Sequence, residues 1–364
     1  MVNVKVVIGA NYGDEGKGLV SGCLAREAAQ KGDKILTVFY NGTTQRAHTF
    51  NGQIRRDTAA GVEFGSDTFY YRQFVVDPIA LYITKATPII DGECRVILPC
   101  DVITNRKLEK ERGTARHGSC GFGLFEAVKR SKHSQYNIKV KDFEDPWNLF
   151  YKLKEIEQVM GSFDDELYNL HNFMQSVEWV KNACKIESFE ETIRNYDTII
   201  FEGGQGLLLD QQNRADFPHL TPSSPGSTFI AKDINKLGVK PQVYYVSRSY
   251  MTRHGAGPME CECSKDSINS AIVDETNQPN DWQGELRFGK LNMYSLWDRI
   301  KKDSSLYRDC EINTVFTQLN YTNNLLETDN GSVALYLPKF IDNLLVSDQK
   351  DRMEIYTQGS KRTF

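Results

Sequence analysis

A glycine-rich segment near the start of the chain carries the residue types needed to bind an anion. Gly13-Asp14-Glu15-Gly16-Lys17-Gly18 follows a β-branched run and precedes a helical pattern. Glycines let backbone N–H groups turn toward an anion, the helix N-terminus adds a favourable dipole, and Lys17 adds positive charge. Asp14 would be unfavourable beside phosphate unless it binds a metal ion or removes a proton. The segment predicts a phosphate loop with acid–base capacity; the alternative is a surface turn with acids in the first helical turn.

Two common nucleotide motifs do not fit this segment. A Walker loop needs a glycine five residues before the Gly-Lys pair and a Ser or Thr after it, but Asn11 and Gly18 stand there. The dinucleotide fingerprint G-x-G-x-x-G fails as well, because the spacing here is G-x-x-G-x-G. The sequence therefore predicts an anion-binding loop of another kind.

The elements around the loop predict an α/β fold. A buried strand at 4–8 precedes the loop, a helix is expected at 19–30, and a second strand at 34–40. Ligands of open α/β sheets gather at the carboxyl ends of the strands, where this loop would lie. Further strands are expected at 95–99, 198–202, 242–247, 313–319 and 333–337.

We expect a single large domain over residues 1–364, with a central, mostly parallel sheet flanked by helices. The apolar period over about 142–190 predicts a helical insertion packed beside the sheet. The polar stretch at about 264–288 predicts a mobile loop. The sequence has neither an internal repeat nor a Pro/Gly/Ser linker that would divide it.

Composition narrows the class of protein. The 364 residues include 44 Lys+Arg against 48 Asp+Glu, a net charge of −4, which argues against binding a nucleic acid polymer. Eight scattered cysteines without a C-x-x-C motif predict reduced thiols and a cytoplasmic location, and Cys261 with Cys263 is too small a set for zinc. We expect neither a membrane span nor a signal peptide.

Several short motifs follow one another along the chain: NYGDEGKG at 11–18, RAHT at 46–49, GSCGFG at 118–123, EGGQG at 202–206 with LLD at 208–210, FPHLT at 217–221, YMTRHGAG at 250–257, LRFGKL at 286–291 and TQLN at 317–320. In this order they resemble W-G-D-E-G-K-G-K, N-A-G-H-T, G-T-T-G-R-G, E-G-A-Q-G-T-L-L-D, Y-P-Y-V-T, Y-T-T-R-V-G-x-G, R-R-x-G-W-L and T-K-L-D of the adenylosuccinate synthetase family. The resemblance implies that family's P-loop-related fold.

The resemblance also implies a reaction, in which the amino group of L-aspartate is joined to C6 of a 6-oxopurine nucleotide. The C6 oxygen leaves poorly, so a nucleoside triphosphate first phosphorylates it. Asp14 matches the family's base at N1, and His48 matches its acid or charge stabiliser at the oxygen. Gln205 matches a residue that holds the purine edge. Mg²⁺ would bridge the triphosphate, with Asp14 and the backbone of Ala47 as ligands.

The remaining positions that match the family imply binding roles. Arg130 matches an arginine that reaches across a dimer interface, so a homodimer is expected. The triphosphate would contact Gly13, Glu15, Gly16, Lys17, Gly18, Thr49, Gln318, Asn320 and Gly359. The monophosphate would contact Asn11, Gln45, Ser119, Cys120, Arg130, Gln205, Thr221 and Arg253, and the carboxylates of aspartate would contact Arg287.

Three departures from the family motifs bear on the substrates. Asn320 replaces the aspartate that reads guanine, and a neutral amide can pair with adenine, so ATP or dATP is expected as donor. Gln45-Arg46-Ala47 replaces Asn-Ala-Gly beside the monophosphate. Glu285 stands where an arginine is usual near aspartate and the ribose, and the loss of that donor suits a deoxynucleotide.

These departures resemble the phage branch of the family, which converts dGMP to N6-succino-2-amino-2′-deoxyadenylate for 2-aminoadenine DNA. If the protein is viral, the host cytoplasm is its expected location. Members of that branch often lack the catalytic aspartate, whereas Asp14 is present here. Adenylosuccinate synthesis from IMP therefore stays open as an alternative, and a non-catalytic nucleotide-binding protein is a second one.

Overall fold

The first strand, β1 (Asn3–Gly9), shows how the sequence builds the sheet of this computed structural model. Its β-branched side chains alternate between two apolar clusters, with Val4, Val6 and Ile8 on one face and Val7 on the other. Because both faces are buried, the strand has an almost continuous apolar run. The structure describes residues 2–274, 284–334, 343–347, 353–357 and 360–363.

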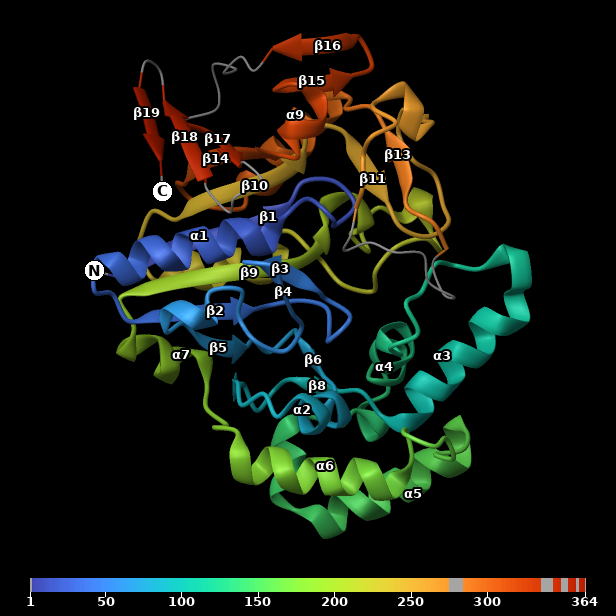
Figure 1. The fold of residues 1–364 in the computed structure, drawn as a ribbon. Helices are drawn as coiled ribbons and strands as arrows, with labels where there is room; N and C mark the ends of the chain where they lie inside the picture. Colours follow the sequence, from blue (N-terminus) through green and yellow to red (C-terminus); the bar gives the residue numbers. More distant parts are fainter. Residues whose placement is uncertain (1, 275–283, 335–342, 348–352, 358–359, 364) are drawn as a thin grey trace.

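The central sheet has the strand order β19-β18-β17-β14-β10-β1-β9-β2-β5-β7 within the described residues (Figure 1). Neighbours from β17 to β7 pair in parallel, and β18 and β19 pair antiparallel at one edge. The bounds are β2 (Ile35–Phe39), β5 (Asp67–Tyr70), β7 (Ile89–Ile90), β9 (Thr198–Gly206), β10 (Gln242–Arg248), β14 (Glu311–Thr317), β17 (Asn343–Ser347), β18 (Met353–Thr357) and β19 (Ser360–Thr363).

Strand order reverses around β1, and this reversal places the site. The chain leaves β1 toward β2 on one side, while β9 and β10 lie directly on either side of β1. The loops after these parallel strands all emerge at the same edge of the sheet, and ligands of open α/β sheets bind at such a switch point. The predicted α/β class with a mostly parallel central sheet is confirmed.

Helices cover both faces of the sheet. On one face, α1 (Lys17–Gln30) packs Val20, Cys23 and Leu24 against Val7 and its neighbours. On the other face, α8 (Ala231–Lys236) and α9 (Met293–Ser304) contribute Ile234, Leu296 and Ile300 to the cluster that holds Val6 and Ile8. The apolar faces of these helices close a two-sided core.

A separate helical region lies beside the β7 edge of the sheet (Figure 1). Its core joins Ile90 of β7 to apolar residues of several helices, including Leu149, Leu153 and Val177. The helices are α2 (Pro78–Thr84), α3 (Pro99–Arg112), α4 (Leu124–Arg130), α5 (Pro146–Met160) and α6 (Leu170–Ala183), and the short α7 (Phe189–Thr192) follows. Helices α5 and α6 fall within 142–190, where the apolar period predicted helical structure.

Two further predicted strands are found in part, and both lie outside the central sheet. At 95–99, only β8 (Arg95–Val96) is a strand; it pairs with β6 (Val75–Val76) outside the central sheet, and Pro99 begins α3 because proline suits the first helical turn. At 333–337, the described part belongs to β16 (Gly331–Ala334), which forms a hairpin with β15 (Leu325–Thr328). The rest of 333–337 lies outside the described residues.

Smaller antiparallel sheets carry the remaining strands. They are β3 (His48–Phe50) with β4 (Gln53–Arg55), and β13 (Arg287–Gly289) between β11 (Met251–Arg253) and β12 (Glu262–Cys263). The loop predicted at 264–288 begins with a 3₁₀ turn at Lys265–Ser267 and ends in β13. Its middle lies outside the described residues, so its mobility stays a prediction. Among the described residues, no helix has both the length and the apolar character to cross a membrane.

Candidate active site

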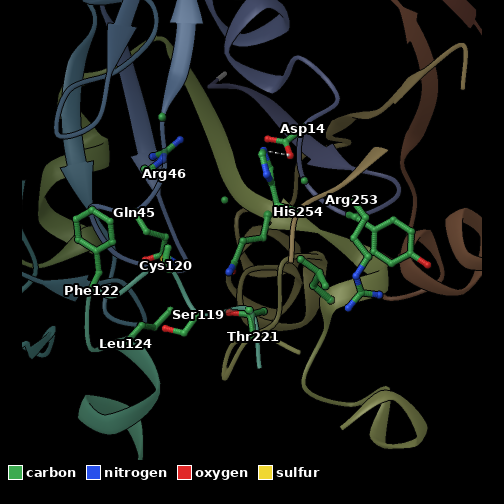
Figure 2. Close-up of a pocket in the computed structure, with 18 of the residues that line it drawn as sticks. Asp14, Gln45, Arg46, Ser119, Cys120, Phe122, Leu124, Thr221, Arg253 and His254 are labelled. Atoms are coloured by element: carbon green, nitrogen blue, oxygen red, sulfur yellow. Dashed lines mark ion pairs between the residues drawn. The ribbon is translucent and has the colours of Figure 1, made fainter. Parts of the chain in front are cut away.

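A cavity of about 1020 Å³ opens at the carboxyl edge of the central sheet (Figure 2). Its walls come from the loops after β1, β2, β9, β10 and β14, together with the segment 117–126 beside α3 and α4. The predicted site residues that line it are Gly13, Asp14, Gly16, Lys17, Gly18, Gln45, Ala47, His48, Thr49, Ser119, Cys120, Gln205, Thr221, Arg253, Gln318 and Asn320. Residues spread from position 13 to position 320 therefore meet in one cavity.

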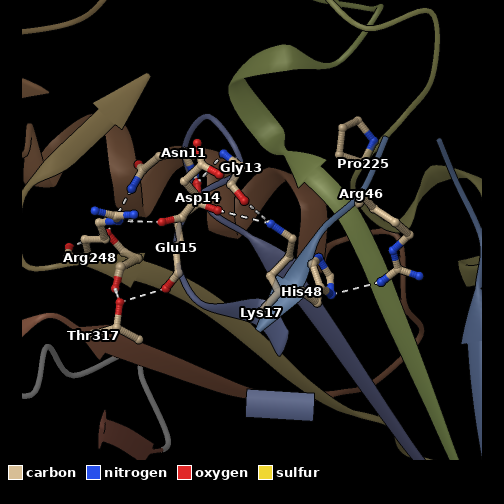
Figure 3. A network of polar contacts seen from close by, with 12 residues as sticks. Asn11, Gly13, Asp14, Glu15, Lys17, Arg46, His48, Pro225, Arg248 and Thr317 are labelled. Atoms are coloured by element: carbon tan, nitrogen blue, oxygen red, sulfur yellow. Dashed lines mark hydrogen bonds and ion pairs between the residues drawn. The ribbon is translucent and has the colours of Figure 1, made fainter. Parts of the chain in front are cut away.

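The glycine loop is held in place by an acid from within its own sequence (Figure 3). Glu15 Oε1 accepts hydrogen bonds from the backbone N–H of Asn11 (3.0 Å) and of Gly13 (2.7 Å), and Oε2 lies 3.3 Å from Lys17 Nζ. Glu15 is 3% exposed and does not line the cavity. Its side-chain oxygens therefore stabilise the loop, and the predicted contact of Glu15 with the triphosphate stays a prediction.

Asp14 projects from this loop into the cavity. Its Oδ2 lies 3.3 Å from Nε2 of His254 (Figure 2), and its backbone carbonyl accepts a hydrogen bond from Nε of Arg248 (Figure 3). The side chain of Asp14 is 28% exposed, so a ligand in the cavity can reach it. A carboxylate in this position can take a proton from a bound ring or coordinate a cation.

His48 is the centre of a buried polar triad with Glu202 and Arg46. Its Nδ1 lies 2.5 Å from Glu202 Oε1, and that oxygen lies 2.6 Å from Arg46 Nη2. Burial and the nearby Arg46 guanidinium lower the pKa of His48 from 6.5 to about 4, so the ring is neutral at pH 7. With Nδ1–H donated to Glu202, Nε2 keeps a lone pair for chemistry.

The approach of His48 to the glycine loop depends on Gly18. A Cβ at position 18 would lie 2.6 Å from the Cβ of His48, closer than such atoms pack. The missing side chain therefore lets α1 and β3 come close enough to place Lys17 and His48 on one wall. This is a packing reason for a glycine within the motif.

The segment 117–121 and the turn at Thr221 form the opposite end of the cavity. Ser119 Oγ donates to Asn105 Oδ1 at 2.7 Å. The hydroxyl of Thr221 is buried and has no hydrogen-bond partner among the described residues. An unpaired buried hydroxyl beside a cavity suits a polar ligand, because leaving it unpaired is costly.

Gln205 and Gln318 line the cavity, and both have a backbone conformation that most residues avoid. Their φ angles are 64° and 60°, in the left-handed region. The side-chain oxygen of Gln205 is buried without a partner among the described residues. Such a strained and unsatisfied residue is typical of a ligand site. Gly359 lies outside the described residues, so its predicted contact with the triphosphate stays a prediction.

Arg130 does not line the cavity of its own chain, and its predicted contact with the monophosphate across a dimer interface stays a prediction. Its guanidinium pairs with Asp101 (2.8 Å) and donates to the carbonyls of Tyr136 (2.6 Å) and Val96 (2.7 Å). The side chain is 3% exposed, and Arg130 does not line the cavity. Each guanidinium nitrogen therefore already has a partner within this chain.

Two other predicted ligands also stand outside the cavity lining. Asn11 lies beneath the glycine loop, where its Nδ2 donates to Ser247 Oγ at 2.9 Å, and its monophosphate contact stays a prediction. Arg287 forms a two-pronged ion pair with Glu262 (2.7 and 2.6 Å), on the strand beside Arg253. Its contact with aspartate stays a prediction that requires this pair to open.

Sequence reasoning missed several residues of the site. Glu202 was recognised only as the start of a motif, although it contacts a histidine 154 residues away. Arg46 was noted only as a departure, and His254 and Arg248 were not considered. The sequence gives little indication of these residues, because each of their contacts joins segments that are far apart in the sequence. The polar residues within the matched motifs were the only clue.

The residues around Asp14 fit a magnesium ion that is shared with a triphosphate. Among the described residues, no group of three or more His, Cys, Asp and Glu side chains is arranged to hold a metal by itself. Mg²⁺ does not require such a cage, because it takes one or two carboxylates and fills its shell with phosphate oxygens and water. The accessible carboxylate of Asp14, beside Lys17, supplies the oxygen ligand that this mode needs.

The fold and the cavity define an α/β nucleotide-binding protein with a glycine loop at its switch point. A profile of the adenylosuccinate synthetase family matches residues 79–285, more than half of the chain. The chain therefore belongs to the adenylosuccinate synthetase family. Among relatives, it is 27% identical over 307 residues to the synthetase of Trichodesmium erythraeum, covering 75% of this chain and 67% of the relative. It is 30% identical over 282 residues to that of Ruthia magnifica, covering 71% and 63%.

Solved structures show the same fold. An adenylosuccinate synthetase from Plasmodium falciparum superposes with a TM-score of 0.70 at 18% identity, covering 88% of this chain and 77% of the other. A succinoaminodeoxyadenylate synthetase from cyanophage S-2L, bound to dGMP and dATP, gives 0.57 at 13% identity and covers 88% and 86%. The chain spans about two thirds of the length of the curated relatives named above.

Proposed function

We propose that the protein is a ligase that joins L-aspartate to C6 of a 6-oxopurine nucleotide, at the expense of a nucleoside triphosphate. The observation that carries this proposal is the convergence of Asp14, Lys17 and His48 on one cavity wall, opposite the hydroxyls of Ser119 and Thr221. The first group suits chemistry at a purine edge beside a triphosphate. The second suits the 5′-phosphate of a monophosphate at the far end.

The chemistry requires two displacements. Asp14 takes the proton from N1, and O6 then attacks the γ-phosphorus while the bond from that phosphorus to the β–γ bridging oxygen breaks and the nucleoside diphosphate leaves. The amino group of aspartate next attacks C6, and O6 departs with the phosphoryl group as inorganic phosphate. Lys17 and the loop N–H groups stabilise the transferred charge.

His48 is placed to exchange a proton during the second displacement. Its free Nε2 can take a proton from the attacking amine, and Glu202 stabilises the imidazolium that forms. Mg²⁺, when bound, would neutralise charge on the triphosphate. Asp14 and the carbonyl of Ala47, which also lines the cavity, are its expected protein ligands.

We further propose dGMP as acceptor and ATP or dATP as donor. Asn320 lines the cavity beside Gln318 and offers an amide that can pair with adenine. Glu285 supports a deoxynucleotide, because its carboxylate cannot donate to a ribose hydroxyl. The cyanophage enzyme, which shares the fold, is bound to dGMP and dATP. The homodimer also stays a prediction.

IMP is the second candidate acceptor, because Asp14 is present and because the curated relatives named above are adenylosuccinate synthetases. Purified protein should be incubated with Mg²⁺, L-aspartate and ATP, with dGMP or IMP as acceptor, and the products separated by chromatography. Conversion of dGMP supports the proposal, and conversion of IMP alone contradicts the dGMP assignment. The variants Asp14→Ala and His48→Ala should lose turnover while still binding nucleotide, whereas the exposed Asp164→Asn serves as control.

If those two variants keep full function, the protein is a nucleotide-binding module and not a ligase. The donor assignment has its own test in Asn320→Asp. A carboxylate accepts from guanine N1–H and N2–H but not usefully from adenine, so preference should move from ATP toward GTP by about tenfold or more. An unchanged ratio of kcat/KM for the two donors would contradict the role of Asn320.

A further inference from the structure

Arg106 of α3 carries a guanidinium with two unpaired nitrogens at the end of the cavity formed by the segment 117–121. The residue is partly buried and lines the cavity, and its Nε donates a hydrogen bond to the carbonyl of Gly121 at 3.2 Å. Its guanidinium carbon lies 5.0 Å from the centre of the Tyr168 ring. Nη1 and Nη2 have neither a hydrogen-bond partner nor an ion-pair partner among the described residues. These two nitrogens are therefore available to a ligand.

Gly121 links this guanidinium to Ser119, because its N–H donates to Ser119 Oγ at 3.3 Å while its carbonyl accepts from the arginine. The turn that holds Thr221 lies against the same segment, since Nδ1 of His219 is 3.2 Å from the carbonyl oxygen of His117. Figure 2 shows Ser119 and Thr221 at this end of the cavity. The guanidinium and the unpaired hydroxyl of Thr221 therefore belong to one end of the cavity.

The acids near this end do not neutralise Arg106. Glu109 lines the cavity but forms its ion pair with Arg112. Burial raises the pKa of Glu126, which also lines the cavity, so its charged form is disfavoured. Asp165 lies outside the cavity lining and accepts hydrogen bonds from two backbone N–H groups. The positive charge of Arg106 therefore has no ion-pair partner among the described residues and favours an anion in the cavity.

We propose that Arg106 binds the 5′-phosphate of the acceptor nucleotide from within the same chain, together with the hydroxyl of Thr221. This inference rests on the proposed function and deepens it, because it assigns a cation to the phosphate end of the cavity. A guanidinium can donate two parallel N–H bonds to phosphate oxygens, and such charge-assisted bonds are stronger than those from neutral donors. The bond from Nε to Gly121 holds the guanidinium in place, so less freedom is lost when phosphate binds.

The test compares each candidate nucleotide with the nucleoside that lacks its phosphate, dGMP with deoxyguanosine and IMP with inosine. Dissociation constants should be measured by calorimetry on the intact protein, and that of ATP alongside. Arg106→Gln removes the charge but keeps an amide that can donate to the Gly121 carbonyl, and Arg106→Lys keeps the charge without the planar fork. Lys107→Gln is the matched control, because it removes the neighbouring charge of an exposed residue outside the cavity lining.

In the native protein and in Lys107→Gln, we expect the acceptor nucleotide to bind at least about tenfold more tightly than its nucleoside. In Arg106→Gln this advantage should fall by about tenfold while the nucleoside and ATP bind as in the native protein, and Arg106→Lys should keep part of it. An unchanged advantage in Arg106→Gln would overturn the inference while leaving the proposed ligase intact. Equal losses for nucleotide and nucleoside, or a loss confined to ATP, would overturn it as well. Binding of none of these nucleotides by the native protein would overturn the proposed function itself.

Discussion

Two buried arginine–carboxylate pairs, Arg46 with Glu202 and Arg130 with Asp101, differ in how fully their polar groups are used. Around Arg130, every guanidinium nitrogen is bonded to Asp101 or to a backbone carbonyl. Around Arg46, Nη2 donates to Glu202, but Nη1 is buried without a hydrogen-bond partner among the described residues. Arg46 lines the cavity and Arg130 does not.

The difference separates a structural pair from a functional one. The complete pair ties α3 to α4 and fixes the wall of the helical region. The incomplete pair, Arg46 with Glu202, supports the neutral His48 at the cavity and keeps one guanidinium nitrogen without a partner among the described residues. A protein tolerates such an unpaired polar group where a ligand or a reaction uses it. Both pairs are buried and charged, so burial and charge do not distinguish them. They differ in whether every guanidinium nitrogen has a hydrogen-bond partner.

The largest expected effect concerns the incomplete pair. Replacing His48 by Asn should lower turnover by about 10²–10⁴-fold, because the proton acceptor that Glu202 orients is lost. Single-turnover assays measure this, and the melting temperature should change little. His133→Asn is the matched control. Full turnover in His48→Asn would show that the Arg46–Glu202 pair has only a structural role, like the Arg130–Asp101 pair.

The complete pair should respond in stability and not in catalysis. In Arg130→Met, the free energy of unfolding should fall by about 3–5 kcal/mol, since Asp101 is left buried and unpaired. Urea denaturation measures this loss. The KM for the monophosphate, assayed at a temperature where the variant is folded, should stay at the native value. A tenfold higher KM with native stability would instead make Arg130 a phosphate ligand.

Lowering the pH should reduce the stability of the folded protein, because His48 beside the incomplete pair becomes protonated. Its pKa is about 4 in the folded protein and 6.5 ordinarily, so the unfolded chain binds the extra proton between these values. The neutral His48 ring makes its full contribution to the free energy of unfolding above pH 6.5. About 3 kcal/mol of this contribution is lost as the pH falls toward 4.

Urea denaturation at several pH values, in the native protein and in His48→Asn, isolates this contribution. The difference between the two free energies of unfolding should change with pH in that window. A difference that stays constant from pH 7 to pH 4 would show that burial does not disfavour the charged ring.

A smaller effect is expected at the far end of the cavity. Thr221→Val removes a buried hydroxyl that has no partner among the described residues, so the KM for the monophosphate should rise by about three- to tenfold. Stability should be unchanged or slightly higher. The exposed Thr84→Val is the control, and an unchanged KM in Thr221→Val would remove this residue from the phosphate site.

The sequence predicted those parts of the fold whose signal is local. The β-branched run before the glycine loop and the helix after it correspond to β1 and α1, and the apolar period at 142–190 corresponds to α5 and α6. The short strands β5 and β7 were not predicted, because two to four residues give no clear alternation. Tertiary pairing makes them strands, because β5 pairs with β2 and β7 pairs with β5.

The candidate site was predicted where motifs carried it and not where long-range contacts did. Asp14, Lys17 and His48 come together as expected. The pairing of Arg130 with Asp101, 29 residues earlier, was not predicted, because nothing in the sequence indicates this contact. Glu202 was missed because its partner is 154 residues away. Which polar group remains unsatisfied depends on the folded arrangement.

The central claim is that the C6 oxygen of the purine is phosphorylated before aspartate displaces it. Acceptor nucleotide labelled with ¹⁸O at O6 should be turned over with Mg²⁺, ATP and L-aspartate, and the inorganic phosphate analysed by mass spectrometry. The account predicts that each phosphate released carries the label. Product formation with unlabelled phosphate would contradict it, because the oxygen would then have left by another route.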